Sequence, residues 1–320
     1  MAYSRSQSSL FRRVSIGSSW LWLGAFALLP GIALLLVSFL DKGEVDFFIP
    51  VLTLHNYEEL VGPVFLKVLW DSVSLAFLST VVCLVVGYPF AYRIARAKSK
   101  WRPWLLLLVI IPFWTNSLIR SYALILIIGA QGMVNKALMA MGVISAPLQM
   151  MYTDFAVFIG LTYTFLPFMV LPLYASIEKL DPNLGDAAKD LGAGPLRTFL
   201  HITLPLTLPG IIAGCILVFL PSLGCFYVPE ILGGAKNMLL GTFIKNQFLV
   251  ANNWPLGAAA SSVLTILLIL MAGLYRLANL RVAEREREGL LPGSDQLERQ
   301  PSRVKLPAGT AATAEGTGIS

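Results

Sequence analysis

Six long runs of apolar residues constrain the fold of this chain more than any other feature. A helix needs about 20 residues to cross the hydrocarbon core of a membrane. The runs that reach this length span approximately 20–40, 68–92, 103–130, 154–176, 207–231 and 258–280. Because a lone segment in lipid can satisfy its backbone hydrogen bonds only as a helix, we expect an all-α membrane protein with six transmembrane helices.

The overall composition excludes a soluble enzyme. Of the 320 residues, 56% are hydrophobic and 13% are charged, whereas an ordinary soluble domain is about 25% charged. The cysteines, Cys83, Cys215 and Cys225, lie inside apolar runs without the spacing of metal ligands. Only His55 and His201 are histidines, which excludes a histidine-rich metal site.

The lysines and arginines predict the orientation of the chain. With the N-terminus inside, 18 of the 24 basic residues fall on cytoplasmic segments, five fall on outer segments, and Arg120 lies within a span. Short cytoplasmic loops carry such an excess of basic residues. We therefore expect both termini to be cytoplasmic. Topology then accounts for the net charge of +6, and no basic aromatic surface indicates a nucleic-acid partner.

Composition divides the chain into three parts. Residues 1–19 form a cytoplasmic N-terminal segment, and 20–282 form a transmembrane domain with a cytoplasmic loop at 177–206. From Glu284 the chain reads EREREGLLPGSDQLERQ and then turns rich in glycine, alanine and threonine. This composition predicts a disordered cytoplasmic tail over 283–320.

The loop at 177–206 carries signals of a short helix. Asp181 followed by Pro182 is typical of a helix start, because aspartate caps the first amides and proline suits the first helical position. We expect a helix over 183–191, with Gly192 and Gly194 available to end it and turn the chain. The glycines and prolines would also suit a simple re-entry hairpin, so the pattern alone leaves both possibilities open.

The residue order of this loop resembles a known motif, which bears on the choice between a helix and a hairpin. The loop reads Asp186-Ala187-Ala188, three residues, Gly192, nine residues and then Ile202-x-Leu204-Pro205. It resembles the EAA loop of permease subunits of bacterial binding-protein-dependent ABC importers. In that family the loop forms a coupling helix that docks on a cytoplasmic ATPase, which implies that role for Asp186, Ala187, Ala188, Gly192, Ile202 and Pro205. Asp186 stands where the family has glutamate and keeps the charge.

The resemblance continues along the membrane domain. The segments concerned are IPFWTNSLIRSYA (111–123), LPFMVLPLYASIEKLD (166–181), PLTLPGIIAGC (205–215) and GGAKNMLLGTFIKNQF (233–248). They are similar to the spermidine/putrescine branch of the family. This implies a type I ABC importer permease fold in a bacterial inner membrane, with a second permease subunit, two ATP-binding subunits and a periplasmic polyamine-binding protein as partners.

The chain itself lacks the motifs of an enzyme. It contains no phosphate-binding GxxxxGK[ST] loop, and GGAKN at 233–237 lacks the spacing. We therefore expect no cofactor in this chain, with ATP and Mg²⁺ held by the partner ATPase.

Ionisable residues in or near a span are costly, so they are candidates for function. Asp71 opens the second span, Asp154 opens the fourth and Glu230 closes the fifth, which puts all three acids at the outer face. Acids near a helix N-terminus also complement the helix dipole, and this accounts for Asp71 and Asp154 without any substrate. Glu230 ends a helix, where an acid opposes the dipole, so it is the strongest candidate.

Aromatic and polar residues accompany these acids. Acids beside aromatic rings suit a polycation such as a polyamine, and Trp114, Phe226 and Tyr227 lie near the same level. Asn116 is a candidate for a polar group facing the substrate path. Arg120 would repel a polyamine, so we interpret it as a structural residue that pairs with an acid or caps backbone carbonyls.

Two further features of the fifth span concern shape. Pro221 predicts a kink, which would suit either a gate beside Phe226 and Tyr227 or a plain packing bend. Gly210 and Gly214 form a GxxxG pattern that predicts close helix packing.

The leading function is thus an ABC importer permease for polyamines. A permease for another solute, such as iron(III) or sulfate, is the alternative. A secondary transporter or channel is disfavoured because it would not use a coupling helix.

Overall fold

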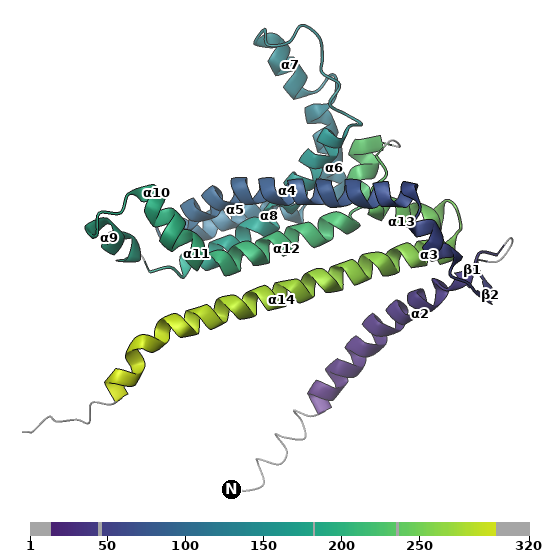
Figure 1. Ribbon diagram of the computed structural model, residues 1–320. Helices are drawn as coiled ribbons and strands as arrows, with labels where there is room; N and C mark the ends of the chain where they lie inside the picture. The colour runs from purple at the N-terminus through teal and green to yellow at the C-terminus, as the bar shows by residue number, and fades with distance from the viewer. Residues whose placement is uncertain (1–13, 44–46, 182, 235–236, 299–320) are drawn as a thin grey trace, which may run out of the picture. The chain divides into compact units, whose positions relative to one another are not determined.

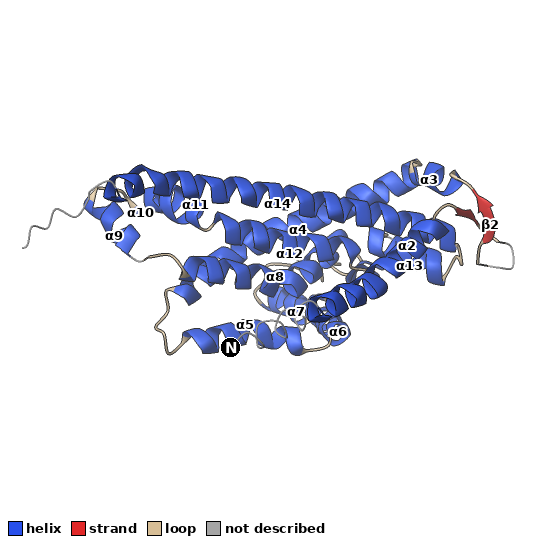
Figure 2. Cartoon of the chain, turned by 90° about the horizontal axis from the view of Figure 1, so that it is seen from below, coloured by secondary structure: helices blue, strands red, loops and turns tan. Residues whose placement is uncertain are grey.

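The computed structural model describes residues 14–43, 47–181, 183–234 and 237–298. The regular elements among them are helices, apart from one antiparallel hairpin in which Leu40 pairs with Leu52 (Figure 2). The first half contains η1 (Gly24–Leu28), α2 (Leu29–Val37), β1 (Leu40–Asp41), β2 (Ile49–Leu52), α3 (His55–Leu60), α4 (Pro63–Ala95), α5 (Arg102–Trp114), α6 (Ser117–Ile128) and α7 (Met133–Ala140). The second half contains α8 (Asp154–Glu178), α9 (Asn183–Asp190), α10 (Pro195–Thr198), η2 (Phe199–Thr203), α11 (Leu204–Leu206), α12 (Leu208–Gly224), η3 (Pro229–Gly233), α13 (Leu240–Leu249) and α14 (Trp254–Glu298).

Five helical stretches of the described chain are long and apolar enough to cross a membrane, and a bent pair of helices qualifies as a sixth. The single helices are Val14–Val37, Pro63–Ala95, Ser117–Ala140, Asp154–Glu178 and Trp254–Leu277. The bent pair is Pro195–Leu206 with Leu208–Gly224. Four of the six predicted spans thus correspond to single long helices, while the third and fifth differ.

The predicted third span, 103–130, is not one continuous helix. α5 ends at Trp114, Thr115 is extended with ψ 147°, and α6 begins at Ser117. The Asn116 side chain accepts a hydrogen bond from the Leu118 amide at 2.8 Å, which is the bond of an N-cap. The apolar run is therefore divided by a cap that starts a second helix.

The predicted fifth span, 207–231, also ends early. α12 stops at Gly224 because Cys225 is extended with ψ 120°. A separate helical segment then begins, with Pro229 at the first position of η3. On the other side of α12, the preceding helix meets it at a bend of 67°.

The core forms where α4, α8 and α12 lie side by side (Figure 1). Leu161, Met169 and Leu173 of α8 are completely buried there. A methyl group on Gly210 would meet the Pro172 carbonyl oxygen at 2.8 Å, and one on Gly214 would meet the Met169 sulfur at 2.7 Å. The predicted close packing at this GxxxG pair is therefore confirmed.

The ends of the described chain behave differently from this core. α2 buries no residue. At the other end, α14 continues to Glu298, so helix replaces the first part of the disordered tail predicted for 283–320. Residues 1–13, Pro182 and 299–320, on which other predictions fell, lie outside the described residues. The chain divides into two compact units, 1–275 and 276–320.

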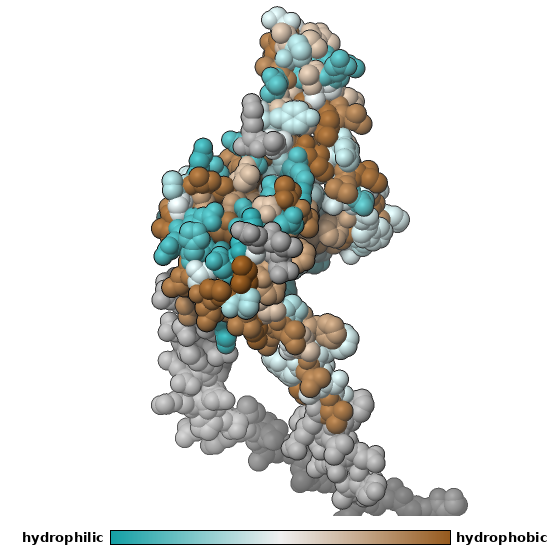
Figure 3. Space-filling model, turned by 90° about the vertical axis from the view of Figure 1, so that its right-hand side faces the viewer, coloured by the Kyte–Doolittle hydropathy of each residue, from teal (hydrophilic) through white to brown (hydrophobic). Residues whose placement is uncertain are grey.

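The segment after α2 is a polar loop that the structure organises around Asn56. This buried side chain donates hydrogen bonds to the Ser38 and Leu40 carbonyl oxygens, at 3.1 and 2.8 Å. It thereby attaches α3 to the start of the hairpin. Figure 3 looks onto this end of the first unit and shows hydrophilic side chains gathered among hydrophobic ones.

Candidate functional site

The described residues hold two candidate sites at opposite ends of α4 and α12 (Figure 1). One is α9 together with the arm that follows it, which is formed by α10, η2 and α11. The other surrounds η3 and α13.

The start of α9 follows the capping pattern predicted from the sequence. The Asp181 carboxylate accepts a hydrogen bond from the Asn183 amide at 2.9 Å. This bond satisfies one of the amides that a helix leaves free at its N-terminus. The predicted helix in the loop is therefore confirmed.

The end of α9 depends on Gly192. Its φ of +78° is favourable for glycine and strained for other residues. The Ala193 amide donates to the Ala188 carbonyl at 2.9 Å, and the Gly192 amide donates to the Lys189 carbonyl at 2.8 Å. This pair of bonds is a Schellman motif, so Gly192 closes the helix and turns the chain into the arm.

The two alanines of α9 face in different directions. Ala188 is buried, whereas Ala187 is exposed. Positions one apart on a helix differ in direction by about 100°, so only one of them can face the rest of the chain. A partner docking on the outer side of α9 would meet Ala187.

Asp186 and Lys189 form an exposed ion pair one turn apart on α9, with Nζ 2.8 Å from Oδ1. The hydrogen bond from Lys189, together with its charge, lowers the pKa of Asp186 from its ordinary value. The same bond raises the pKa of Lys189. Both groups therefore stay charged at neutral pH. The pair is lost as the pH falls through the lowered pKa of Asp186 or rises through the raised pKa of Lys189.

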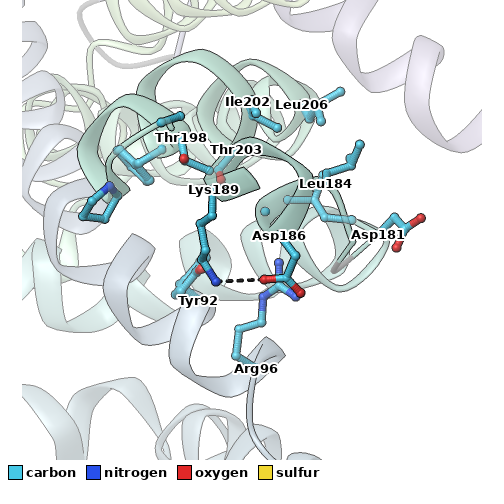
Figure 4. A pocket seen from close by; sticks show the side chains of 15 residues that line it. Tyr92, Arg96, Asp181, Leu184, Asp186, Lys189, Thr198, Ile202, Thr203 and Leu206 are labelled. Carbon is cyan, nitrogen blue, oxygen red and sulfur yellow. Dashed lines mark hydrogen bonds and ion pairs between the residues drawn. The ribbon is translucent and has the colours of Figure 1, made fainter. Parts of the chain in front are cut away.

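A cavity of about 560 Å³ lies between α9, the arm and the end of α4 (Figure 4). Its lining includes Tyr92 of α4, the residue Arg96 that caps this helix, Asp186 and Lys189 of α9, and Ile202 of η2. The predicted coupling residue Ile202 thus faces the same cavity as Asp186. Pro205 lies farther along the arm in α11 and is exposed.

The arm joins α12 at Thr207, which is completely buried. The Thr207 Oγ1 atom lies 2.9 Å from the hydroxyl of Tyr88 on α4. Neither residue was singled out from the sequence. A tyrosine in an apolar helix gives no signal of a partner 119 residues away.

At the other end, Glu230 does not close the fifth span as predicted. It lies in the first turn of η3, because α12 ends at Gly224 and Pro229 starts the new segment. An acid at this position agrees with the helix dipole, so our dipole argument for Glu230 was wrong. Its carboxylate is instead paired with the ammonium group of Lys245 on α13.

Phe226 and Tyr227 lie at the break between α12 and η3. Their rings are perpendicular, with centroids 6.1 Å apart, and Phe226 is 44% exposed. The aromatic pair and Glu230 thus lie together in the short stretch that follows the break, and Lys245 joins them from α13. Lys245 was missed as a site residue, although it lies in the quoted segment 233–248.

The other two acids differ from each other. α4 begins at Pro63, so Asp71 lies more than two turns inside the helix, where the dipole explanation does not apply. Asp154 is exposed in the first turn of α8, where that explanation fits. The residue after Asp71 ties α4 to α13, because Ser72 Oγ accepts a hydrogen bond from the Leu240 amide at 2.7 Å.

Trp114, Asn116 and Arg120 surround the break between α5 and α6. Trp114 is 74% exposed, while the Asn116 side chain is engaged in its cap. Arg120 is 7% exposed, and neither its Nε nor its Nη1 atom has a hydrogen-bond partner within the described residues. Its guanidinium lies 6.0 Å from the Phe113 ring centroid. The acid or carbonyl partner that we expected is therefore not present in the described part of the chain.

Comparison with known proteins identifies the family. The model of the family described as "Binding-protein-dependent transport system inner membrane component" matches residues 84–284. The chain belongs to this family. It is therefore a multi-pass component of the inner membrane, and the resemblance inferred from the loop at 177–206 is confirmed.

Relatives from this family cover most of the chain. The spermidine/putrescine transport system permease protein PotB of Escherichia coli (strain K12) is 51% identical over 82% of this chain and 96% of that protein. PotB of Haemophilus influenzae is 47% identical over 84% of this chain and 94% of that protein. A bacterial alginate ABC transporter, crystallised with an alginate pentasaccharide-bound periplasmic protein, matches with a TM-score of 0.71 at 16% identity. It covers 88% of this chain and 98% of its own, which supports the fold of an ABC importer permease.

Proposed function

We propose that this chain is a permease subunit of an ATP-driven importer that moves polyamines such as spermidine and putrescine across the bacterial inner membrane. The observation that carries the proposal is the 51% identity to PotB of E. coli over nearly the whole of that protein. The acids and aromatic rings near η3 agree with a polycationic substrate.

The proposed topology has six spans, counting the bent pair as one, with both termini in the cytoplasm. The excess of lysine and arginine on the predicted cytoplasmic segments supports it. The arm then lies on the cytoplasmic side, and η3 and α13 lie near the outer side.

In this proposal α9 and the arm couple the chain to two cytoplasmic ATPases, which hold the ATP and Mg²⁺. We propose that this chain itself binds no cofactor. The coupling residues are those of the loop motif, Asp186, Ala187, Ala188, Gly192, Ile202 and Pro205. A second permease subunit completes the pathway, and a periplasmic binding protein delivers the substrate.

At the outer mouth, the proposed pathway runs past Phe226 and Tyr227 to Glu230. An ammonium group of the polyamine would replace that of Lys245 on the Glu230 carboxylate. The aromatic rings would add cation–π attraction once water is excluded. Asp71, Asp154, Trp114 and Asn116 remain candidates for contacts along the path.

The deciding experiment measures uptake of radiolabelled spermidine and putrescine into proteoliposomes that hold the complete transporter and its binding protein. We compare the wild type with Glu230→Gln, and with Glu59→Gln as a matched control, because Glu59 is exposed in α3 and lacks an ion pair within the described residues. We expect roughly a tenfold loss of uptake for Glu230→Gln, since a charge-assisted hydrogen bond is removed, and little change for Glu59→Gln.

Two results would contradict the proposal in different ways. Equal uptake by the wild type and Glu230→Gln would show that Glu230 does not contact the substrate, while the proposal that the cargo is a polyamine would stand. A complex that hydrolyses ATP in response to its binding protein, yet takes up neither polyamine, would require another cargo, such as iron(III) or sulfate.

A further inference from the structure

The bend between the coupling arm and α12 is held by a chain of buried hydroxyl groups. Thr207, at the bend, has φ −94° and ψ 1°, outside the helical range. Its Oγ1 atom donates to the Thr203 carbonyl of the arm at 2.9 Å. Since that proton is used, the Tyr88 hydroxyl is the donor in the 2.9 Å bond between the two side chains. The bonds thus run from α4 through the bend into the arm.

Tyr88 contacts the arm a second time through its ring. The ring packs edge-on against Phe199 of η2, with centroids 5.4 Å apart and planes at 87°. Tyr88 is itself only 8% exposed. One side chain of α4 therefore fixes both the bend and the residue that starts the π-helical turn of the arm.

The chain is tightly packed after this bend and partly exposed before it. Beyond it, Gly210 and Gly214 bring α12 against α8 so closely that a methyl group would not fit. Before it, the arm presents Leu196 and Leu200, which are 70% and 47% exposed. A force applied to the arm passes along the chain to the α8–α12 pair through the bend, and a soft bend would absorb part of the movement.

We propose that the Tyr88–Thr207 hydroxyl bond is the joint that transmits movement of the arm to α4 and α12. Both are positioning residues, since they are buried at the bend and would act through the arm. This inference rests on the proposed role of the arm as the element that an ATPase moves. Without the bond the arm flexes at Thr207, so that ATP is hydrolysed with less transport.

The test removes the bond with minimal change of shape. Tyr88→Phe and Thr207→Val each delete one hydroxyl group, and Thr207→Ser retains it. Tyr163→Phe on α8 is the control, because it makes the same chemical change on an exposed ring. The complete complex is reconstituted with its binding protein. The measured quantity is the ratio of polyamine taken up to phosphate released by ATP hydrolysis. We expect this ratio to fall about two- to tenfold for Tyr88→Phe and for Thr207→Val, with no further loss in the double variant.

A second measurement is independent of the cargo. Spin labels at Leu196→Cys on the arm and Leu217→Cys on α12 report the angle at the bend in lipid nanodiscs. The native cysteines, Cys83, Cys215 and Cys225, are replaced by alanine. We expect a narrow distance distribution for the wild-type bend and for Thr207→Ser, and a broadened one for Tyr88→Phe and Thr207→Val.

The outcomes separate this inference from the proposed function. Unchanged distance distributions in both hydroxyl-deleting variants would show that the Tyr88–Thr207 bond does not stiffen the bend, whatever the cargo is. Broadened distributions in a complex that imports no polyamine would support the joint and reject only the cargo. A wild-type ratio of uptake to hydrolysis in both variants would also overturn the joint.

Discussion

Gly192 shows how one backbone angle controls the coupling loop. Its left-handed conformation lets two amides return to the last turn of α9, and no other atom lies within 4 Å of where a side chain would begin. Any effect of substitution there therefore arises from the backbone and not from a clash.

We expect Gly192→Val to weaken the end of α9 by about 1–2 kcal/mol, the cost of the left-handed conformation for an L-residue. Uptake into proteoliposomes should fall severalfold while membrane insertion is retained. Gly185→Ala is the matched control. It also has no atom within 4 Å, but it lies inside α9 at an ordinary angle, and alanine favours a helix. Wild-type uptake by Gly192→Val would exclude α9 from coupling.

Arg120 is an uncompensated cation in the described residues, so its removal should stabilise the subunit. We expect Arg120→Met, which retains most of the apolar stem, to raise the free energy of unfolding by about 1–3 kcal/mol, the usual cost of a buried group without partners. The thermal unfolding midpoint of the detergent-solubilised subunit measures this. A lower midpoint would mean that Arg120 has a partner that the described residues do not supply.

At the scale of elements, hydropathy predicted the uninterrupted helices well and the interrupted ones poorly. The second span was expected over 68–92 and forms α4, Pro63–Ala95; the fourth was expected over 154–176 and forms α8, Asp154–Glu178. Hydropathy reports whether a segment suits lipid, not whether its backbone is continuous. The signal of the break was nevertheless present, because Asn116 is a favourable N-cap.

The cap gives a test of this break. Asn116→Ala removes the acceptor for the Leu118 amide and should destabilise the fold by about 0.5–2 kcal/mol, whereas Asn116→Asp keeps an acceptor and should cost little. Thermal unfolding distinguishes the two variants. Equal loss of uptake in both, without a change in stability, would instead indicate that the Asn116 amide group contacts the substrate.

The candidate sites were predictable only in part, for a physical reason. Asp181, Gly192 and the helix between them follow from local rules that connect neighbouring residues. The Glu230–Lys245 and Tyr88–Thr207 pairs join elements that are distant along the chain. Their partners could be known only once the packing of α13 and α4 was known.

At the scale of the whole molecule, the topology can be tested with two exposed leucines. Leu191 after α9 is 89% exposed, and Leu52 in β2 is 82% exposed. In a background without the native cysteines, we expect a membrane-impermeant maleimide to label Leu52→Cys in spheroplasts and Leu191→Cys only in inverted vesicles. Because their exposure is similar, a difference in labelling reports the side of the membrane. The reverse pattern would invert the proposed orientation.

The ion pair at η3 has a consequence for the substrate. The side chain of Lys245 is a primary amine on four methylene groups. It corresponds to a four-carbon diamine in which attachment to the backbone replaces one of the two amino groups. The chain therefore presents a built-in mimic of its proposed cargo to Glu230. A polyamine would not have to find an empty carboxylate, because it would exchange one ammonium group for another.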